Sequence, residues 1–382
     1  MARAAEESKT SRLAAYYDRN TRAFLRLGVG GSVGVIHRGL WPPGVNDAAS
    51  AARVVHRRLV ALLAEYAAGS AVATHESRAD RGRERVTSSQ RPLRVADFGC
   101  GVGATLCEVA TAFPSMRGVG ITLSETQVVA SRARAEAAGL ADRVIFECAD
   151  FEAFDAAAWL ATRAVDAHRG VRDFDGVGDT GGRDADCGER PGVELSGSDR
   201  SAEAVRRADR GDGHEAAAIE RRDDTRLDAI WAIEAFAHAP NPQDFLVNAA
   251  RQLKSGGLLV VVDDFLVKPA QNLTPAGRRR IERFARGWHL PALDTPSALI
   301  ARAQSAALQL VSEQDLTPLI RLRRPRDRLA RITAFGARVL GGWRYPFFAN
   351  VIGGDALNAG LRHGELSYRW LVFRREGDNR SA

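Results

Sequence analysis

The stretch Leu93-Arg94-Val95-Ala96-Asp97-Phe98, followed at once by Gly99-Cys100-Gly101-Val102-Gly103, decides the fold. An apolar run, a turn with glycine at every second position and a helical pattern through Leu106 and Val109 succeed one another. Glycine lets a backbone approach a ligand closely, and the N-terminus of a helix offers free N–H groups. The stretch therefore predicts a strand–turn–helix unit with a binding site at its turn.

Similar strand and helix patterns continue along the chain. Helical patterns over Glu125–Ala138 and Pro242–Leu253 lie between apolar runs, and alternation at this spacing is typical of a parallel, doubly wound sheet. Helices are also expected over Pro275–Arg286, Thr295–Ala306, the arginine-rich Arg321–Leu340 and Ala356–Arg362. The other predicted strands are Val119–Thr122, Arg143–Glu147, Leu227–Ile233, Leu258–Asp263 after a turn at 254–257, Leu308–Glu313 and Leu366–Arg374.

Two polar segments interrupt this pattern. Residues 70–92 are charged without apolar periodicity and are predicted to be a flexible insert. Residues 156–225 are rich in Asp, Arg and Gly, and burial of so few apolar side chains cannot offset the entropy lost on ordering. We interpret 156–225 as a disordered insertion, with a small regulatory subdomain as the alternative. Residues 1–69 then form an N-terminal helical cap, and 93–155 with 226–382 form the main domain.

Composition excludes several classes of protein. The 382 residues include 54 Lys and Arg against 47 Asp and Glu, a net charge of +7, but only Lys9, Lys254 and Lys268 are lysine. The arginines are spread without interleaved aromatic residues, so no nucleic-acid partner is expected. Apolar runs stay far below the ~20 residues of a membrane span, and no signal segment opens the chain. A cytoplasmic protein without stable membrane insertion is predicted.

Cysteine and glycine spacing narrow the choice of ligand. The four cysteines show no CxxC spacing, so neither a metal site nor a disulfide framework is expected. A dinucleotide site needs GxGxxG and an acid about 20 residues later, whereas this turn is GxGxG and the next strand ends in Thr122-Leu123-Ser124. NAD is therefore the second choice of cofactor.

The motifs resemble those of the class I S-adenosylmethionine-dependent methyltransferases. Asp97-x-Gly99-Cys100-Gly101-x-Gly103 is similar to the first motif of that family, and Val119-Gly120-Ile121-Thr122-Leu123-Ser124-x-x-Gln127 resembles a variant of its second. The variant is typical of the branch with cyclopropane fatty acid synthases, tocopherol methyltransferases and geranyl diphosphate C-methyltransferases. The resemblance implies a Rossmann-like seven-stranded sheet with an N-terminal helical cap and a C-terminal substrate lid.

The resemblance also assigns the S-adenosylmethionine site. Asp97 would order the glycine turn or reach the amino group of the cofactor, and Thr122 and Gln127 would lie by its ribose. Asp150 and Phe151 would flank the adenine, although Asp150 also fits a helix N-cap. Tyr17 belongs to a segment that resembles the cofactor-covering opening of this branch, or else to an ordinary amphipathic helix. Cofactor contacts are thus expected from Tyr17, Asp97, Gly99, Cys100, Gly101, Gly103, Thr122, Gln127, Asp150 and Phe151.

The reactive groups are expected after the fourth strand, at Glu234 and His238. By the resemblance, Glu234 aligns with a glutamate that removes a proton from a carbocation during C-methylation of an isoprenoid or other alkene. Glu234 as a structural partner of the cofactor loop or of an arginine is the alternative. Another acceptor is an oxygen or nitrogen of a natural product, with His238 or His289 as base. A cyclopropane-forming lipid methyltransferase and a non-catalytic binding module are further alternatives.

The substrate is expected to be small and hydrophobic, with an anionic group. His37 and Arg38 form a basic pair that suits an anion, and Trp288 and His289 begin a region of mixed aromatic and basic residues that suits a hydrophobic tail. Mg²⁺ is expected only if the substrate is a diphosphate. The sequence leaves a homo-oligomer open.

Overall fold

The computed structural model describes residues 14–15, 17–18, 21, 34–69, 92–161, 225–322 and 325–377. The chain divides into two compact units, Met1–Phe154 with Leu227–Ala382, and Asp155–Arg226. Of the second unit only 155–161 and 225–226 are described, so the predicted insertions 70–92 and 156–225 lie almost wholly outside the described residues.

The first unit is built on a seven-stranded sheet in the order β3-β2-β1-β4-β5-β7-β6. Neighbours from β3 to β5 are parallel, and β7 is antiparallel to both β5 and β6. This confirms the predicted Rossmann-like sheet. The strands are β1 (Arg94–Phe98), β2 (Arg117–Thr122), β3 (Val144–Cys148), β4 (Leu227–Ile233), β5 (Leu253–Leu266), β6 (Leu308–Asp315) and β7 (Leu366–Arg375).

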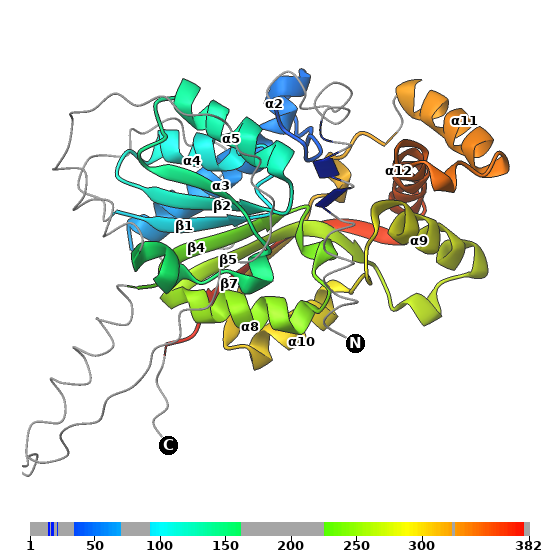
Figure 1. Ribbon diagram of the computed structural model, residues 1–382. Helices are drawn as coiled ribbons and strands as arrows, with labels where there is room; N and C mark the ends of the chain where they lie inside the picture. Colours follow the sequence, from blue (N-terminus) through cyan, green and yellow to red (C-terminus); the bar gives the residue numbers. More distant parts are fainter. Residues whose placement is uncertain are drawn as a thin grey trace, which may run out of the picture. The chain divides into compact units, whose positions relative to one another are not determined.

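Helices cover both faces of the sheet. Figure 1 shows α4 (Ala104–Ala112) and α5 (Glu125–Ala137) on one face, and α8 (Pro242–Gln252) and α10 (Pro296–Ser305) on the other. Chain order reverses between β1 and β4, which is where doubly wound sheets bind ligands at the carboxyl ends of their strands. The remaining helices are α2 (Ala48–Ala52), α3 (Val54–Ala67), α9 (Pro275–Trp288), α11 (Pro325–Val339) and α12 (Pro346–Arg362), with short 3₁₀ turns at Phe151–Ala153 (η2) and Phe236–His238 (η3).

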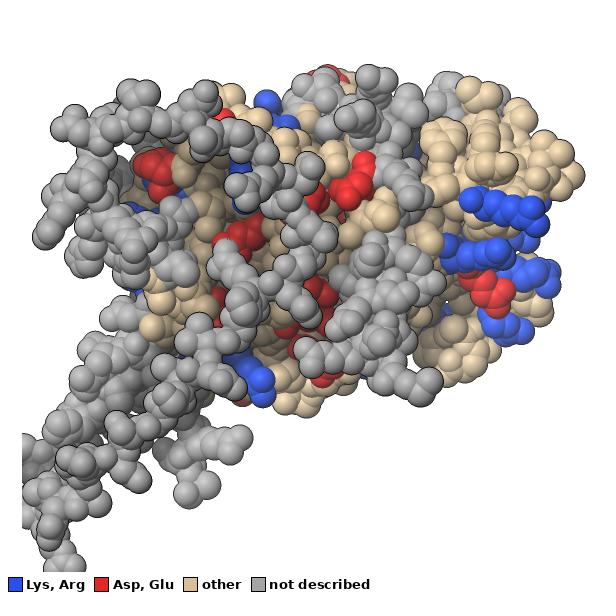
Figure 2. Space-filling model, in the orientation of Figure 1, with Lys and Arg blue, Asp and Glu red and all other residues tan. Residues whose placement is uncertain are grey.

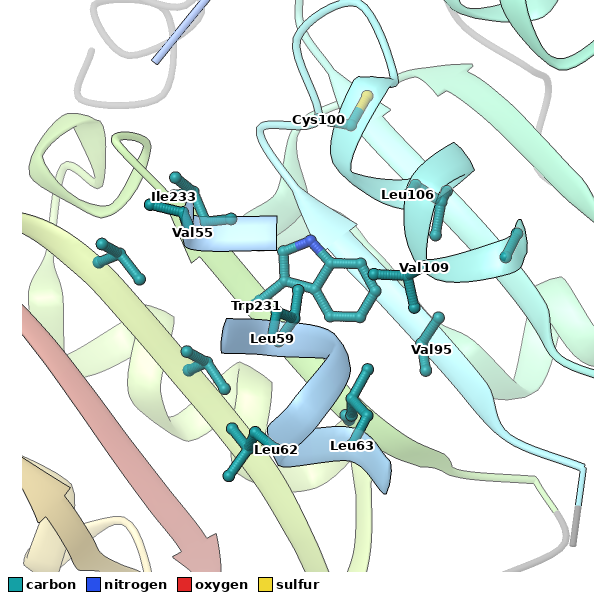
Figure 3. Close-up of a cluster of buried hydrophobic side chains, with 14 of the residues drawn as sticks. Val55, Leu59, Leu62, Leu63, Val95, Cys100, Leu106, Val109, Trp231 and Ile233 are labelled. Carbon is teal, nitrogen blue, oxygen red and sulfur yellow. The ribbon is translucent and has the colours of Figure 1, made fainter. Parts of the chain in front are cut away.

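The core beneath the site is apolar and centred on Trp231 of β4. Figure 3 shows its indole surrounded by side chains from α3, β1 and α4. Trp231 is fully buried, and the α3 residues that cover it recur at the three- and four-residue spacing of an amphipathic helix. They are Val55, Leu59, Leu62 and Leu63. The same packing fixes the carboxyl ends of β1 and β4.

Two predicted boundaries were wrong. The turn expected at 254–257 is part of β5, because Lys254 is buried and its Nζ lies 3.0 Å from both carboxylate oxygens of Asp228 on β4. Helix α12 begins at Pro346 and not at Ala356. Its glycines weaken the helical pattern, but a Cβ on Gly287 of α9 would lie 2.7 Å from the Cα of Gly353, so these glycines let the two helices approach closely.

Within the described residues, no helix combines the length and apolar character needed to cross a bilayer.

Candidate functional site

The glycine turn after β1 adopts a left-handed backbone at all three of its glycines, with φ of 77° at Gly99, 54° at Gly101 and 73° at Gly103. A Cβ on Gly99 would collide with Ala235, and one on Gly103 would lie 2.7 Å from the Phe146 ring. At Gly101 the nearest atom to such a Cβ is Ile36 Cδ1, at 3.4 Å. Gly99 and Gly103 are therefore required by packing, whereas a Cβ on Gly101 would make only ordinary van der Waals contact with Ile36.

Asp97 at the end of β1 carries an unsatisfied buried oxygen. Its side chain is 2% exposed, and Oδ2 has no hydrogen-bond partner among the described residues. Burial raises the pKa of Asp97 to about 7, with the neighbouring Trp231 side chain acting in the opposite direction. A buried acceptor without a partner at a ligand-binding turn is a group that a ligand's N–H can satisfy. Next to it, burial raises the pKa of the Cys100 thiol, so Cys100 fills space and does not react.

Thr122 and Gln127, at the end of β2, are hydrogen-bonded to each other. Thr122 Oγ1 donates to Gln127 Oε1 at 2.6 Å, and Gln127 Nε2 donates to Thr21 at 3.2 Å. Asp18 adds a carboxylate that accepts from Ser124 Oγ at 2.5 Å and from Thr126 N at 3.2 Å. The structure thus ties the N-terminal segment to the start of α5, at the two residues, Thr122 and Gln127, that the resemblance assigns to the ribose.

Asp150 and Phe151 lie after β3. Asp150 Oδ1 accepts from the backbone N–H of Glu152 at 2.9 Å, so Asp150 caps the short helix η2, as in the alternative interpretation of this residue. The Phe151 ring stacks on Phe98 of β1 with centroids 5.7 Å apart. The half-buried Phe151 therefore presents an apolar surface beside the glycine turn.

Residues 34–40, which we call the strap, carry Arg38 to the carboxyl ends of β4 and β5. Arg38 donates its backbone N–H and its Nε to Glu234 Oε1, at 3.1 and 2.8 Å, and its Nη1 to Asp264 Oδ1 at 2.9 Å. The guanidinium also lies over the Tyr368 ring, 4.3 Å from its centroid. Arg38 is therefore held by two carboxylates, and an anionic substrate would have to compete with both of them.

Glu234 has a strained backbone and a paired side chain. Its φ of 52° is in the left-handed region that non-glycine residues rarely adopt, and its N–H donates to Val262 O at 2.8 Å. Burial alone would raise the pKa of Glu234, but the charge of Arg38, then that of His37, and the hydrogen bonds from Arg38 lower it below its ordinary value. Glu234 is consequently a weaker base than an unpaired buried carboxylate.

The neighbouring Asp263 is a third acid at this place. It accepts from Ala237 N at 2.9 Å, and burial, followed by the charge of Asp264, raises its pKa to about 7. Near Arg38 the structure thus describes three carboxyl groups, those of Glu234, Asp263 and Asp264.

His37 is not presented as a second cation beside Arg38. It is buried, and burial, followed by the charge of His56, lowers its pKa to about 4, so His37 is neutral at physiological pH. Its Nε2 lies 2.8 Å from His56 Nε2, and His56 Nδ1 lies 2.8 Å from Glu108 Oε2. The expectation of a basic pair is therefore corrected: burial discharges His37, and Arg38 is already paired.

His238 lies in η3, after β4. One nitrogen of its ring has no hydrogen-bond partner among the described residues. Its Nε2 lies 2.7 Å from Tyr17 Oη, and its buried Nδ1 has no hydrogen-bond partner there. Burial, followed by the charge of His289, lowers the pKa of His238 to about 4. His238 is therefore a neutral imidazole that brings Tyr17 of the N-terminal segment to the end of β4.

The predicted substrate residues Trp288 and His289 lie at the end of α9. Trp288 Nε1 donates to Asn350 O at 3.3 Å, and its ring packs edge-on against Phe284, so Trp288 joins α9 to α12. His289 caps α9 with a φ of 57° and is close enough to influence His238. Of Trp288 and His289, it is therefore His289 that lies near His238.

Sequence reasoning missed four residues: Asp18, His56, Asp264 and Tyr368. A usable signal existed for Asp264, because two adjacent acids end the apolar run 258–262, where a buried strand is expected. Asp18, His56 and Tyr368 reach the site only through tertiary contacts. In the described part of the chain, no three His, Cys, Asp or Glu side chains are grouped as ligands for a metal ion.

Comparison with known proteins agrees with this architecture. The family model described as a methyltransferase domain matches residues 71–317. The 27-O-demethylrifamycin SV methyltransferase of Amycolatopsis mediterranei is 25% identical over 228 residues, which are 60% of this chain and 58% of that enzyme. The aligned part of this chain therefore spans less than two thirds of that relative.

Solved structures share the fold at low sequence identity. A cyclopropane synthase from Mycobacterium tuberculosis has a TM-score of 0.57 at 13% identity, with 96% of this chain and 98% of that chain covered. The geranyl diphosphate C-methyltransferase of Streptomyces coelicolor A3(2) has a TM-score of 0.53 at 15% identity, with the same coverage. Since the family model covers well over half of its length, the chain belongs to the methyltransferase domain family, as a class I S-adenosylmethionine-dependent methyltransferase.

Proposed function

We propose that this enzyme methylates a hydroxyl oxygen of a small, hydrophobic natural product, with His238 as the proton acceptor. The observation that carries the proposal is the unpartnered, buried Nδ1 of a neutral histidine at the carboxyl end of β4. Glu234, the other candidate base, is held by Arg38. His238 Nδ1 thus has no hydrogen-bond partner among the described residues, whereas Glu234 Oε1 already accepts two hydrogen bonds from Arg38.

The residues around the glycine turn fit the cofactor. Asp97 Oδ2 is a buried acceptor without a partner among the described residues, and the amino group of S-adenosylmethionine would donate to it. Gly101 has no side chain to come between the backbone of the turn and the cofactor. The half-buried Phe151 ring, stacked on the buried Phe98, offers an apolar surface for the adenine. When bound, S-adenosylmethionine supplies an electrophilic methyl group.

His238 has the chemistry that a hydroxyl acceptor needs. An alcohol oxygen that gains a methyl group must lose its proton, and a neutral imidazole is the usual group to accept it. In the tautomer that carries its proton on Nε2, His238 donates to Tyr17 Oη and keeps a lone pair on Nδ1. The low pKa keeps Nδ1 unprotonated over the whole physiological pH range, but it also makes His238 a weak base, so the proposal rests on the unpartnered Nδ1 and not on its basicity.

The curated relative supports an oxygen acceptor. Its name, 27-O-demethylrifamycin SV methyltransferase, describes methylation of an O-demethyl natural product. We extend to this chain only the class of acceptor, a hydroxyl group on a hydrophobic molecule.

C-methylation of an isoprenoid or other alkene, with Glu234 as base, is the second candidate. The carboxylate of Glu234, with the neighbouring acids Asp263 and Asp264, would stabilise a positive charge on the substrate. Against it, Arg38 weakens Glu234 as a base and is itself unavailable to a diphosphate. Mg²⁺ would be needed only for such a diphosphate, as in the complex of the Streptomyces enzyme, which contains Mg²⁺ and a thiolodiphosphate.

The test is single-turnover methyl transfer with wild type and His238→Ala on hydroxylated, hydrophobic natural products that include 27-O-demethylrifamycin SV, with the product identified by mass spectrometry. We expect a rate loss of ~10²-fold or more with unchanged cofactor affinity, because a general base contributes on that scale. His363→Ala is the matched control, since His363 is exposed at the end of α12. A His238→Ala enzyme that keeps the wild-type rate would contradict the role of His238. Turnover of alkenes but not of hydroxylated acceptors would favour the second candidate.

A further inference from the structure

Helix α11 exposes a continuous row of large apolar side chains. Leu329, Ile332, Phe335, Val339 and Leu340 are between 60% and 85% exposed. Their spacing places them along one side of the helix, while Ala334 and Ala337 on the other side are buried against α12. We call these five residues the α11 apolar face. Isolated exposed apolar residues are common, but a whole helical face of them marks an interaction surface.

A second group of exposed apolar side chains follows the helix in the chain. Tyr345, Phe347 and Phe348 follow α11 in the chain and are 63%, 44% and 37% exposed. Their rings touch one another edge-on, with centroids 6.4 and 5.4 Å apart. Aromatic side chains of this kind are favoured at the boundary between water and lipid.

Arginines border the α11 apolar face. Arg283 of α9 is close enough to Arg338 of α11, and to Arg279 and Arg280, for their charges to lower its pKa, after the larger effect of burial, while the acid Asp355 acts in the opposite direction. Arg280 is paired with Glu365. Figure 2 shows the result: the blue groups over α9 lie beside the tan surface over α11, with one red group among them. The margin of the apolar face therefore has an excess of positive charge.

The positive charge distinguishes between a second copy of the protein and a membrane as the partner of the α11 apolar face. In a symmetric contact between two copies, the same patch lies on both sides, so both sets of arginines would come to a shared interface without added acidic partners. A membrane surface with anionic lipids offers both an apolar interior and negative headgroups. Long arginine side chains can reach the headgroups while their helix lies in the interface plane.

We propose that α11 lies on the surface of membranes that contain anionic lipids, with the α11 apolar face among the acyl chains and Arg279, Arg283 and Arg338 at the headgroups. The contact is peripheral, and it does not depend on which atom the enzyme methylates.

The test measures co-sedimentation of the whole protein with vesicles of phosphatidylcholine containing about 30 mol% phosphatidylglycerol, and with phosphatidylcholine alone. We expect the protein to bind the anionic vesicles. Binding should fall by about tenfold or more when phosphatidylglycerol is left out, or in ~1 M salt, where charges are screened. Equal binding to both kinds of vesicle, or none to either, would overturn the proposal.

Two double variants separate the apolar and charged contributions. Ile332→Ser with Leu340→Ser removes apolar contact and should lower partitioning by about 100-fold or more. Arg279→Gln with Arg283→Gln should lower it by about 30-fold, as expected for two arginines near an anionic surface. Val129→Ser is the control, because Val129 is 66% exposed on α5, away from α11, and it should change nothing.

Folding and self-association are checked on the same samples. Each variant should keep nearly the wild-type melting temperature, because Ile332, Leu340 and Arg279 are exposed and Arg283 is only partly buried. Light scattering without vesicles should give the same mass for wild type and the Ile332/Leu340 variant. A wild-type dimer that this variant dissociates would assign the face to a second copy and overturn the membrane proposal.

Discussion

Arg38 reaches Glu234 with both its backbone N–H and its guanidinium, across 196 positions of sequence. The pair joins the strap to the carboxyl end of β4, and Asp264 extends it to β5. One arginine thus fixes the segment that covers the glycine turn and lowers the pKa of the acid beside it. The following predictions test what this arrangement and the groups around it do.

Replacing Arg38 should destabilise the protein strongly. Arg38→Gln leaves Glu234 and Asp264 buried without their cation, and breaking a buried ion pair from one side costs about 3 to 5 kcal/mol. Urea unfolding measures the loss. Arg117→Gln, at an exposed position at the start of β2, is the control and should stay within about 0.5 kcal/mol of wild type. An equally small effect of Arg38→Gln would show that Arg38 is not a structural partner of the two acids.

Glu234→Gln separates heteroatom methylation from carbon methylation. The amide keeps the volume and can still accept from Arg38, but it loses the charge and the basicity. With a hydroxylated acceptor we expect a single-turnover loss below about tenfold, because alignment of the reactants supplies much of the rate. A loss of ~10²-fold or more, with cofactor affinity unchanged, would instead identify Glu234 as the general base of an alkene reaction.

Substitutions at two glycines of the turn should separate folding from cofactor binding. Gly103→Ala should destabilise the fold, because its Cβ would lie 2.7 Å from the Phe146 ring. Gly101→Val should leave the protein folded, at a backbone cost of about 1 to 2 kcal/mol, and should abolish S-adenosylmethionine binding. Thermal unfolding and calorimetry with S-adenosylmethionine measure the two effects. Near-normal affinity in folded Gly101→Val would remove Gly101 from the cofactor site.

His238 should make stability depend on pH. Because burial lowers its pKa from 6.5 to about 4, the unfolded chain takes up a proton between these values that the folded protein does not. Stability is therefore lost as the pH falls, and wild type should lose about 2 kcal/mol more than His238→Gln between about pH 7 and pH 5. Comparing wild type with the variant removes the opposite contributions of Asp97 and Asp263, whose pKa values are raised. His363→Gln should follow wild type; parallel curves for His238→Gln would mean that His238 is not buried as a neutral group.

Much of the fold could be predicted because its signals are local. The run from Leu93 to Gly103 specifies a strand, a turn and the start of a helix through neighbouring residues, and the structure shows β1, three left-handed glycines and α4 there. The prediction failed where burial changed the local preference, as at Lys254, whose charge enters the core because Asp228 neutralises it.

The candidate site could be predicted only in part. The positions of Glu234 and His238 after β4 follow from the strand pattern, but their partners come from the strap and the N-terminal segment. Whether Arg38 is a free cation, and whether His37 is charged at all, depends on groups brought together from distant parts of the chain. No periodicity or composition carries that information.

The sequence by itself determined the family, the order of strands and helices and the place of the glycine turn, because each follows from short-range patterns. Only the tertiary structure decided that Arg38 is shared by Glu234 and Asp264, that His37 is neutral and that His238 keeps a free nitrogen. The physical reason is that pairing and charge state depend on burial and on distances between groups, and these exist only once segments remote in sequence are packed together.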